Sequence, residues 1–214
     1  QLGRSQKEPI IPLRFENAEV FRGGVEAAAN HARAFCADVR IWSEGRSIRK
    51  VRFVDKIYLR KLGEVHYEDG ELPSERFSAE DADVVVVADF GHGLITSPYQ
   101  TSVLCGLDRF LAVSAQTNSS NVGFNLITKY SRADYAVIDE PEARLAASDR
   151  TSPIRDVAET LARGRFKKFI ITHGPHGAYG WEDGKFIHQP TYTGFVRDTM
   201  GAGDAFFAVT APMA

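Results

Sequence analysis

A run of five apolar residues at 84–88 constrains the fold of this chain more than any other segment. Such a run suits a parallel β-strand that is covered on both faces, because neither side of it then meets water. Further strands are expected at 110–114, 135–138 and 168–172, with helices between them and a hairpin over 178–188. This alternation predicts an α/β fold with a doubly wound, mostly parallel sheet flanked by helices, in which ligands bind at the carboxyl ends of the strands.

The segment before this core has a different pattern. Residues 10–22 and 49–62 mix apolar and polar side chains and are expected to form exposed strands of a small β-sheet, a lid beside the α/β core. An alanine-rich stretch at 25–37 predicts a helix between them, and 39–42 predicts one more strand. The lid sheet could also pair with a second subunit to form a homodimer, because exposed strand edges accept partners.

Composition narrows the classes of function. The 214 residues carry a formal net charge of -2, so the chain offers no basic surface for nucleic acid or for an anionic membrane. No apolar run approaches the roughly 20 residues that a membrane span needs, and no signal peptide is recognised at Gln1. Cys36 and Cys105 lie in apolar segments and are expected to be free thiols of a reducing compartment, the cytoplasm.

The most informative motif is Asp-Thr-Met-Gly-Ala-Gly-Asp at 198–204, directly before an apolar segment. The first amides of a helix lack partners inside the helix, and the helix dipole adds positive potential there. Gly201 and Gly203 carry no side chain that would keep a phosphate away from such amides. Asp204 would stand beside that phosphate, where a carboxylate can take the proton of an attacking hydroxyl. An ordinary acidic first turn is the alternative.

Residues 198–204 resemble the D-T-x-G-A-G-D signature of the ribokinase-like carbohydrate kinases, the PfkB family, with Met200 at the free position. The resemblance covers most of the chain and is closest to the heptose-phosphate-kinase-like branch. It implies one ribokinase-like kinase domain over 1–214, which is incomplete near 45–46 and after 214 when compared with that family.

The same resemblance implies an enzyme that uses ATP and Mg²⁺ to phosphorylate a hydroxyl of a sugar or sugar phosphate, with a heptose-phosphate-like acceptor favoured. Asp204 would be the general base, and Gly201, Ala202 and Gly203 would form the anion hole for the phosphoryl group. Two alternatives stay open. The acceptor could be a nucleoside or another small alcohol, or the domain could bind nucleotide or sugar without catalysis.

The segment 172–177 resembles the T-x-G-x-x-G stretch that lines the nucleotide in this family. Thr172, Gly174 and Gly177 match it, and the resemblance assigns them to the nucleotide together with Thr199 of the signature. Glycines there let the backbone pass close to the ligand. A tight turn into the following hairpin explains Gly177 equally well.

Asp139 and Glu142 stand where the family has an N-x-x-E motif, with Asp139 in place of the asparagine. The resemblance assigns them to Mg²⁺, which prefers oxygen ligands and keeps most of its waters. Both residues also suit the first turn of a helix, where the dipole favours acids. The two interpretations are compatible.

The resemblance assigns Gly23, Gly24, Asn30 and Asp89 to the acceptor. A glycine pair lies over the bound sugar in this family, and Asn30 is the first asparagine after the pair. Asp89 opens D-F-G-H-G-L-I-T, which is similar to the D-Y-G-K-G-V-L-T stretch of the heptose-phosphate kinases. Asp89 could instead hold a magnesium-bound water. An ordinary turn at the glycines and a strand-to-loop exit at Asp89 are the structural alternatives.

Two polar groups have open roles. Lys50 or Arg52 could meet a phosphorylated acceptor, although a solvated strand face explains most charges of that segment. Asn118, Asn121 and Asn125 could contact the substrate or cap a helix.

Overall fold

The structure is a computed structural model that describes residues 12–43, 47–58, 60–70, 79, 81–95, 98–118, 121–192, 194–196 and 199–214. The strands are β1 (Ser47–Val54), β2 (Lys61–Asp69), β3 (Val84–Asp89), β4 (Phe110–Ala115), β5 (Ala133–Asp139), β6 (Phe166–Thr172), β7 (Ala178–Glu182) and β8 (Lys185–Gln189). The α-helices are α1 (Gly24–Ala32), α2 (Pro98–Cys105), α3 (Glu140–Ala147), α4 (Ile154–Ala162) and α5 (Ala202–Thr210).

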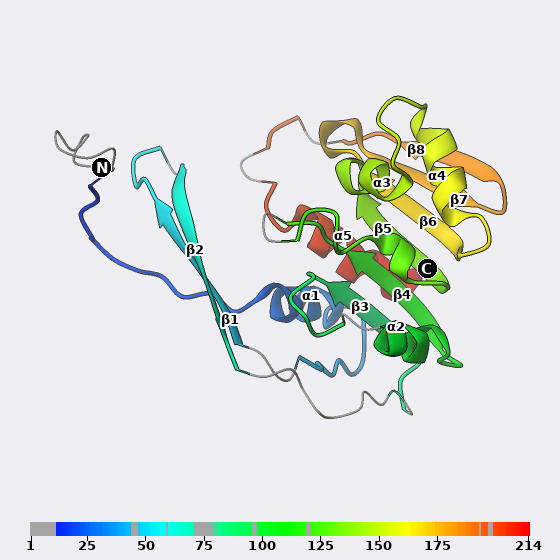
Figure 1. The fold of residues 1–214 in the computed structure, drawn as a ribbon, viewed down its shortest axis with the longest axis horizontal. Coiled ribbons are helices and arrows are strands. Elements are labelled where there is room, and N and C mark those ends of the chain that lie inside the picture. Colours follow the sequence, from blue (N-terminus) through cyan, green and yellow to red (C-terminus); the bar gives the residue numbers. More distant parts are fainter. Residues whose placement is uncertain are drawn as a thin grey trace.

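The core is a six-stranded sheet in the order β3-β4-β5-β6-β7-β8 (Figure 1). Strands β3 to β6 pair in parallel, and β7 and β8 continue the sheet in antiparallel fashion. The register sets Asp89 beside Ala115 and Asp139 beside Thr172, so the carboxyl ends of the parallel strands share one edge. The mostly parallel α/β sheet expected from the sequence is confirmed.

Side chains alternate between the two faces of this sheet, because successive residues of a strand point in opposite directions. Leu111 and Val113 pack on the face that α2, α3 and α4 cover. Ala112 and Tyr135 pack on the other face, against Phe207 of α5. Helices therefore cover both faces (Figure 1), as the doubly wound pattern predicts.

Helix α1 packs beside α5 and buries Ala28 and Ala29. It ends at Ala32, earlier than the predicted 25–37, and a turn follows. In the described part of the chain, every helix is too short or too polar to cross a membrane.

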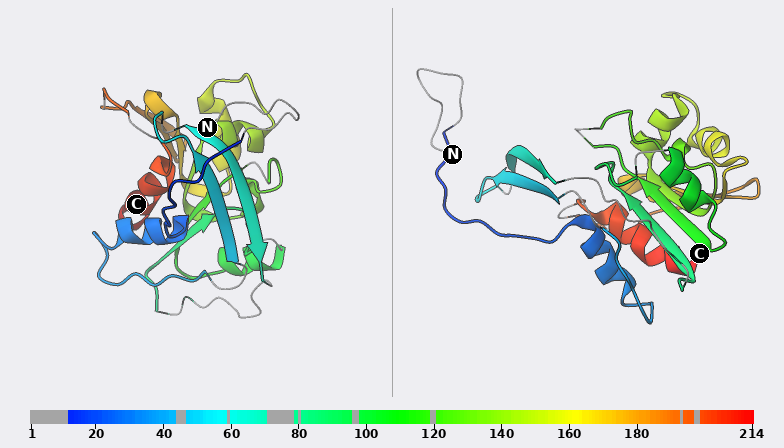
Figure 2. Two further views of the ribbon diagram at one scale, coloured as in Figure 1. Left: turned by 90° about the vertical axis from the view of Figure 1, so that its left-hand side faces the viewer. Right: turned by 60° about the horizontal axis from the view of Figure 1, so that its bottom comes forward.

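Strands β1 and β2 form a separate antiparallel sheet, the lid sheet, which projects away from the core (Figures 1 and 2). Asp55 fixes the turn between them, because its Oδ1 accepts the amide hydrogens of Ile57 and Tyr58 at 3.0 and 2.9 Å. The predicted lid segment 49–62 contains this turn and parts of both strands.

Two predicted strands are wrong where the structure describes them. Residues 12–22 and 39–42 have no regular secondary structure. Their side chains suit an exposed strand, but a strand also needs a hydrogen-bonding neighbour. Within the described residues, β1 and β2 pair only with each other. Residues 10 and 11 and the junction at 45–46 lie outside the described residues.

Candidate active site

The predicted base, Asp204, lies in the first turn of α5 and contacts the end of β4. Gln116, the first residue after β4, donates a hydrogen bond from Nε2 to Asp204 Oδ1. Burial raises the pKa of the Asp204 carboxyl, and this hydrogen bond lowers it. Gln116 could not be identified from the sequence, because a single glutamine after a strand forms no recognisable pattern with other residues.

Helix α5 begins without a capping side chain. Its N-cap, Gly201, has φ 74°, a left-handed value that favours glycine. Ala202 donates its amide hydrogen to the Thr199 carbonyl at 3.1 Å, which argues against its predicted place in the anion hole. Within the described ranges, the amides of Gly201 and Gly203 have no acceptor and can hold a phosphate.

Asp139 and Glu142 form a capping box at the start of α3. Asp139 Oδ1 accepts a hydrogen bond from the Glu142 amide at 2.8 Å, and Glu142 Oε2 accepts one from the Asp139 amide at 3.1 Å. Glu142 Oε1 also accepts from the Thr117 amide at 2.8 Å. Burial and the neighbouring Asp139 raise the pKa of Glu142 to about 7. The helix-start interpretation of both acids is therefore correct.

These two acids also fit Mg²⁺, as partners of its water shell. Both oxygens of Glu142 accept amide hydrogens, whereas Asp139 is exposed and lines a pocket. Among the described residues, there is no cluster of three or more metal-ligating side chains. Mg²⁺ usually keeps several waters and needs only one or two carboxylates, so a closed cage is not required.

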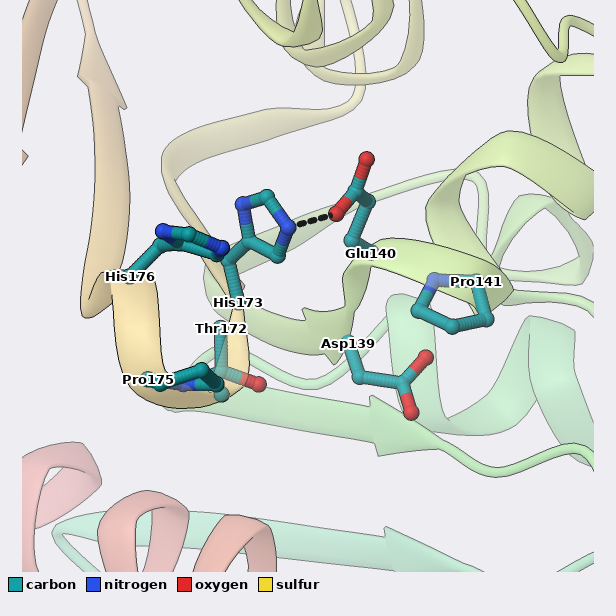
Figure 3. A pocket seen from close by; sticks show the side chains of 8 residues that line it. Asp139, Glu140, Pro141, Thr172, His173, Pro175 and His176 are labelled. Atoms are coloured by element: carbon teal, nitrogen blue, oxygen red, sulfur yellow. Dashed lines mark ion pairs between the residues drawn. The ribbon is translucent and has the colours of Figure 1, made fainter.

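A pocket of about 480 Å³ lies between the start of α3 and the loop after β6 (Figure 3). It brings together three predicted residues, Asp139, Thr172 and Gly174. It also includes Glu140 and His173, which pair through Oε2 and Nε2 (Figure 3). The sequence motifs did not single out this pair, because its two members lie in different motifs.

Gly177 has a structural explanation. Its φ is 92°, and a Cβ there would lie 2.0 Å from the Gln189 carbonyl oxygen. Its own carbonyl accepts the amide hydrogen of His173 at 2.8 Å, which closes the turn before β7. The geometry thus favours the tight-turn interpretation over a nucleotide contact.

Asp89 is only 5% exposed, and its carboxylate faces the interior. Tyr130 donates its hydroxyl hydrogen to Oδ2 at 2.7 Å, and Lys129 pairs with the same oxygen. The Gly91 amide donates to Oδ1 at 3.0 Å. The structure therefore argues against the predicted sugar contact, because internal groups occupy both oxygens.

The three asparagines after β4 hold the loop that follows β3. Asn118 and Asn121 donate from Nδ2 to the Phe90 carbonyl at 2.8 and 3.2 Å. Asn125 donates to the Asp89 carbonyl at 3.1 Å. Neither open role, substrate contact or helix cap, describes these contacts.

The predicted acceptor residues of α1 lie in different surroundings. Gly24 packs against Phe90, because a Cβ at Gly24 would lie 2.5 Å from the Phe90 Cζ. Gly23, the exposed N-cap of α1, has no such neighbour. Asn30 Oδ1 accepts a hydrogen bond from Arg33 Nη1 at 2.6 Å on the exposed side of the helix, so the structure gives its predicted sugar contact no support.

The lid sheet brings charge to the loop after β3. Burial and the nearby Lys50 lower the pKa of His92, while Glu68 raises it. Arg52 pairs instead with Glu64 within the lid. Lys50 and Arg52 share one face of β1, because alternate residues of a strand point the same way. Of these two cations considered for a phosphorylated acceptor, Lys50 is the one whose charge acts on His92.

Comparison with known proteins supports a carbohydrate kinase. Residues 118–211 match the pfkB family of carbohydrate kinases. Over 136 residues, 61% of this chain, the sequence is 27% identical to the bifunctional protein HldE of Nitrobacter hamburgensis. The match spans only 27% of the length of that protein.

Solved structures share the fold at low identity. Ribokinase from Thermotoga maritima has a TM-score of 0.60 at 18% identity, covering 81% of this chain and 59% of its own. A protein named Sa239 has a TM-score of 0.63 at 17% identity, covering 96% and 79%. A variant of phosphofructokinase-2 from Escherichia coli has a TM-score of 0.50 at 14% identity, covering 60% and 43%. Residues 118–211 thus resemble the pfkB carbohydrate kinases, and the solved structures share the ribokinase-like fold.

Proposed function

We propose that this chain is a single kinase domain that transfers the γ-phosphoryl group of ATP to a hydroxyl of a sugar or sugar phosphate. The observation that carries the proposal is the half-buried Asp204 carboxylate at the start of α5. It lies beside the bare glycine end of the helix and accepts a hydrogen bond from Gln116. A base and an anion site side by side suit transfer between an alcohol and a phosphate.

In the proposed reaction, the acceptor hydroxyl gives its proton to Asp204 while its oxygen bonds to the γ-phosphorus. The bond from that phosphorus to the bridging oxygen breaks, and ADP leaves. The amides of Gly201 and Gly203 stabilise the charge of the phosphoryl group in transfer. Mg²⁺, held through water by Asp139 and Glu142, would neutralise charge on the phosphates.

The two ligands would approach from different sides. We assign the nucleotide to the pocket beside α3, lined by Thr172 and Gly174, with Thr199 of the signature beside it. The acceptor would lie under the lid sheet, beside Gly23 and Gly24. Closure of the lid would exclude water and limit hydrolysis of ATP. The use of ATP favours a cytoplasmic location.

A heptose-phosphate-like acceptor is favoured by two observations. The matched region is similar to HldE, and Lys50 lies where a second phosphate could be bound near the loop after β3. A nucleoside or other small alcohol is the alternative within the same reaction. A catalytically silent binding domain is the alternative outside it.

A panel of sugars, sugar phosphates and nucleosides with labelled ATP tests the proposal. Asp204→Asn should lower the rate about 10²- to 10⁴-fold. Asp156→Asn, the same change in the first turn of α4, should leave it unchanged. Full activity of Asp204→Asn would refute the base. Binding of ATP without turnover of any acceptor would favour the silent domain.

A further inference from the structure

Gln116 is fixed in place by its backbone. Its amide donates to the Asp89 carbonyl at 2.8 Å, and its carbonyl accepts from Asn125 Nδ2 at 3.0 Å. Both partners belong to the buried network around Asp89. The side chain is therefore the only part of Gln116 that reaches toward α5, where it meets Asp204 Oδ1.

The geometry points to Gln116 as the positioning residue of the base, an inference that rests on the proposed function. An ionised carboxylate only accepts hydrogen bonds, so the amide nitrogen faces it. With Oδ1 held, the carboxylate cannot turn freely, and Oδ2 has no partner within the described residues. Oδ2 is thereby left for the acceptor hydroxyl, in a fixed direction.

Thr117, the residue after Gln116, contacts the other part of the proposed site, the start of α3. Thr117 donates its amide hydrogen to Glu142 Oε1 at 2.8 Å. One dipeptide after β4 thus contacts both the base and the acid proposed for the Mg²⁺ shell. Misplacement of a reacting group by about 1 Å can cost about 10²-fold in rate, so this link bears on kcat more than on binding.

Two substitutions separate positioning from simple packing. Gln116→Met keeps the length of the side chain and removes its donor, and Gln116→Glu keeps the shape but replaces the donor with an acceptor. Gln189→Met is the matched control, since Gln189 is an exposed residue of β8 whose side-chain amide donates to the Pro190 carbonyl and the Tyr192 hydroxyl. Thermal unfolding of all variants reports whether the fold is kept.

We expect Gln116→Met to lower kcat about 10- to 100-fold while the KM for ATP stays within about 3-fold. The pKa of Asp204, read by carbon NMR of its carboxyl, should rise in Gln116→Met because the hydrogen bond that lowers it is gone. It should rise further in Gln116→Glu.

Two results would overturn the inference: a kcat within about 2-fold of wild type in Gln116→Met, or an Asp204 pKa that ignores both substitutions. The NMR titration needs no turnover. If the wild type phosphorylates nothing, yet the Asp204 pKa responds as stated, the proposed function fails and the role of Gln116 in holding Asp204 stands.

Discussion

The hydroxyl of Tyr130 donates a hydrogen bond to Asp89 Oδ2 across 2.7 Å, and both residues are buried. Lys129 pairs with the same carboxylate. Burial and the Asp89 charge raise the pKa of Tyr130 well above its ordinary value, so its hydroxyl stays protonated and remains a donor. The aspartate that ends β3 is therefore an anchor of the loop after it.

This arrangement predicts that Asp89→Asn lowers the stability of the protein more than Tyr130→Phe does, as measured by urea denaturation. Tyr130→Phe should lower the free energy of unfolding by about 1 kcal/mol, the typical worth of one hydrogen bond. Asp89→Asn should cost about 3 kcal/mol, because Lys129 is left without its counterion in a partly buried site. Tyr58→Phe, at an exposed site, is the control. Normal stability of Asp89→Asn with loss of acceptor binding would instead restore the ligand role.

The glycine pair before α1 offers a matched comparison. Gly24→Ala should destabilise the chain by about 1 to 3 kcal/mol, because its Cβ would lie 2.5 Å from the Phe90 ring. Gly23→Ala meets no atom within 4 Å and should cost less than Gly24→Ala, since it loses only the preference of an N-cap for glycine over alanine. Calorimetry of both, and of Gly24→Ala with Phe90→Leu, checks the contact. Equal melting temperatures for the two single variants would contradict it.

Two glycines of the loop after β6 should differ in role: Gly177 should matter for folding and Gly174 for binding of the nucleotide. Gly177→Ala should cost at least about 2 kcal/mol, because its φ is 92° and its Cβ would meet the Gln189 carbonyl. Gly174→Ala has φ 49° and open space, so it should cost only about 1 kcal/mol. Since Gly174 lines the pocket, this variant should raise the KM for ATP. An unchanged KM would remove Gly174 from the nucleotide site.

Glu142 predicts a pH dependence of stability. Its pKa rises from 4.5 to about 7 on folding, so the folded state favours the protonated acid. The stabilisation is complete below pH 4.5 and is lost as the pH rises through 7. Glu142→Gln should flatten this slope in thermal unfolding curves, since glutamine still suits the capping box. Glu182→Gln, a change at an exposed position of β7, should leave the slope as it is in the wild type.

The effect of Mg²⁺ on the melting temperature is a second test of Glu142. A cation beside Asp139 and Glu142 would favour their ionised forms. Added Mg²⁺ should therefore raise the melting temperature above pH 7 in the wild type and much less in Glu142→Gln. An equal effect in both proteins would argue against these acids as partners of the Mg²⁺ waters.

The lid sheet predicts a homodimer through one of its faces. Val51 lies opposite Val65 and Arg49 opposite Tyr67, so Val51, Val65 and Tyr67 share a face with Phe53. Phe53, Val65 and Tyr67 are each 40–42% exposed. Phe53→Glu should shift the protein toward a monomer in analytical ultracentrifugation, whereas Ile57→Glu in the turn should not. A wild-type protein that stays monomeric at every concentration tested would refute the homodimer.

The core could be predicted because its buried strands are recognisable in the sequence as short apolar runs. The apolar run at 84–88 became β3, and the cap formed by Asp139 and Glu142 begins α3 as their spacing indicated. The segment 12–22 could not be predicted, since alternation of side chains does not reveal whether a neighbouring strand exists. Gln116 and Asp204 are far apart in sequence, and only the folded sheet brings them into contact.

Asp89 shows a different obstacle. An acid at the end of a strand can face a ligand or the interior, and the choice depends on Tyr130 and Lys129, residues from a distant turn. Local motifs therefore show where a strand ends, but they do not show which groups the polar side chains at that end contact.

The sheet order has a consequence for synthesis on the ribosome. Because β3 to β8 lie side by side in the order of the chain, each strand can join the edge of those already made. The helix that carries Asp204 follows all six strands. In a nascent chain, the pocket beside α3, which we propose for the nucleotide, would thus be made before Asp204, the proposed base.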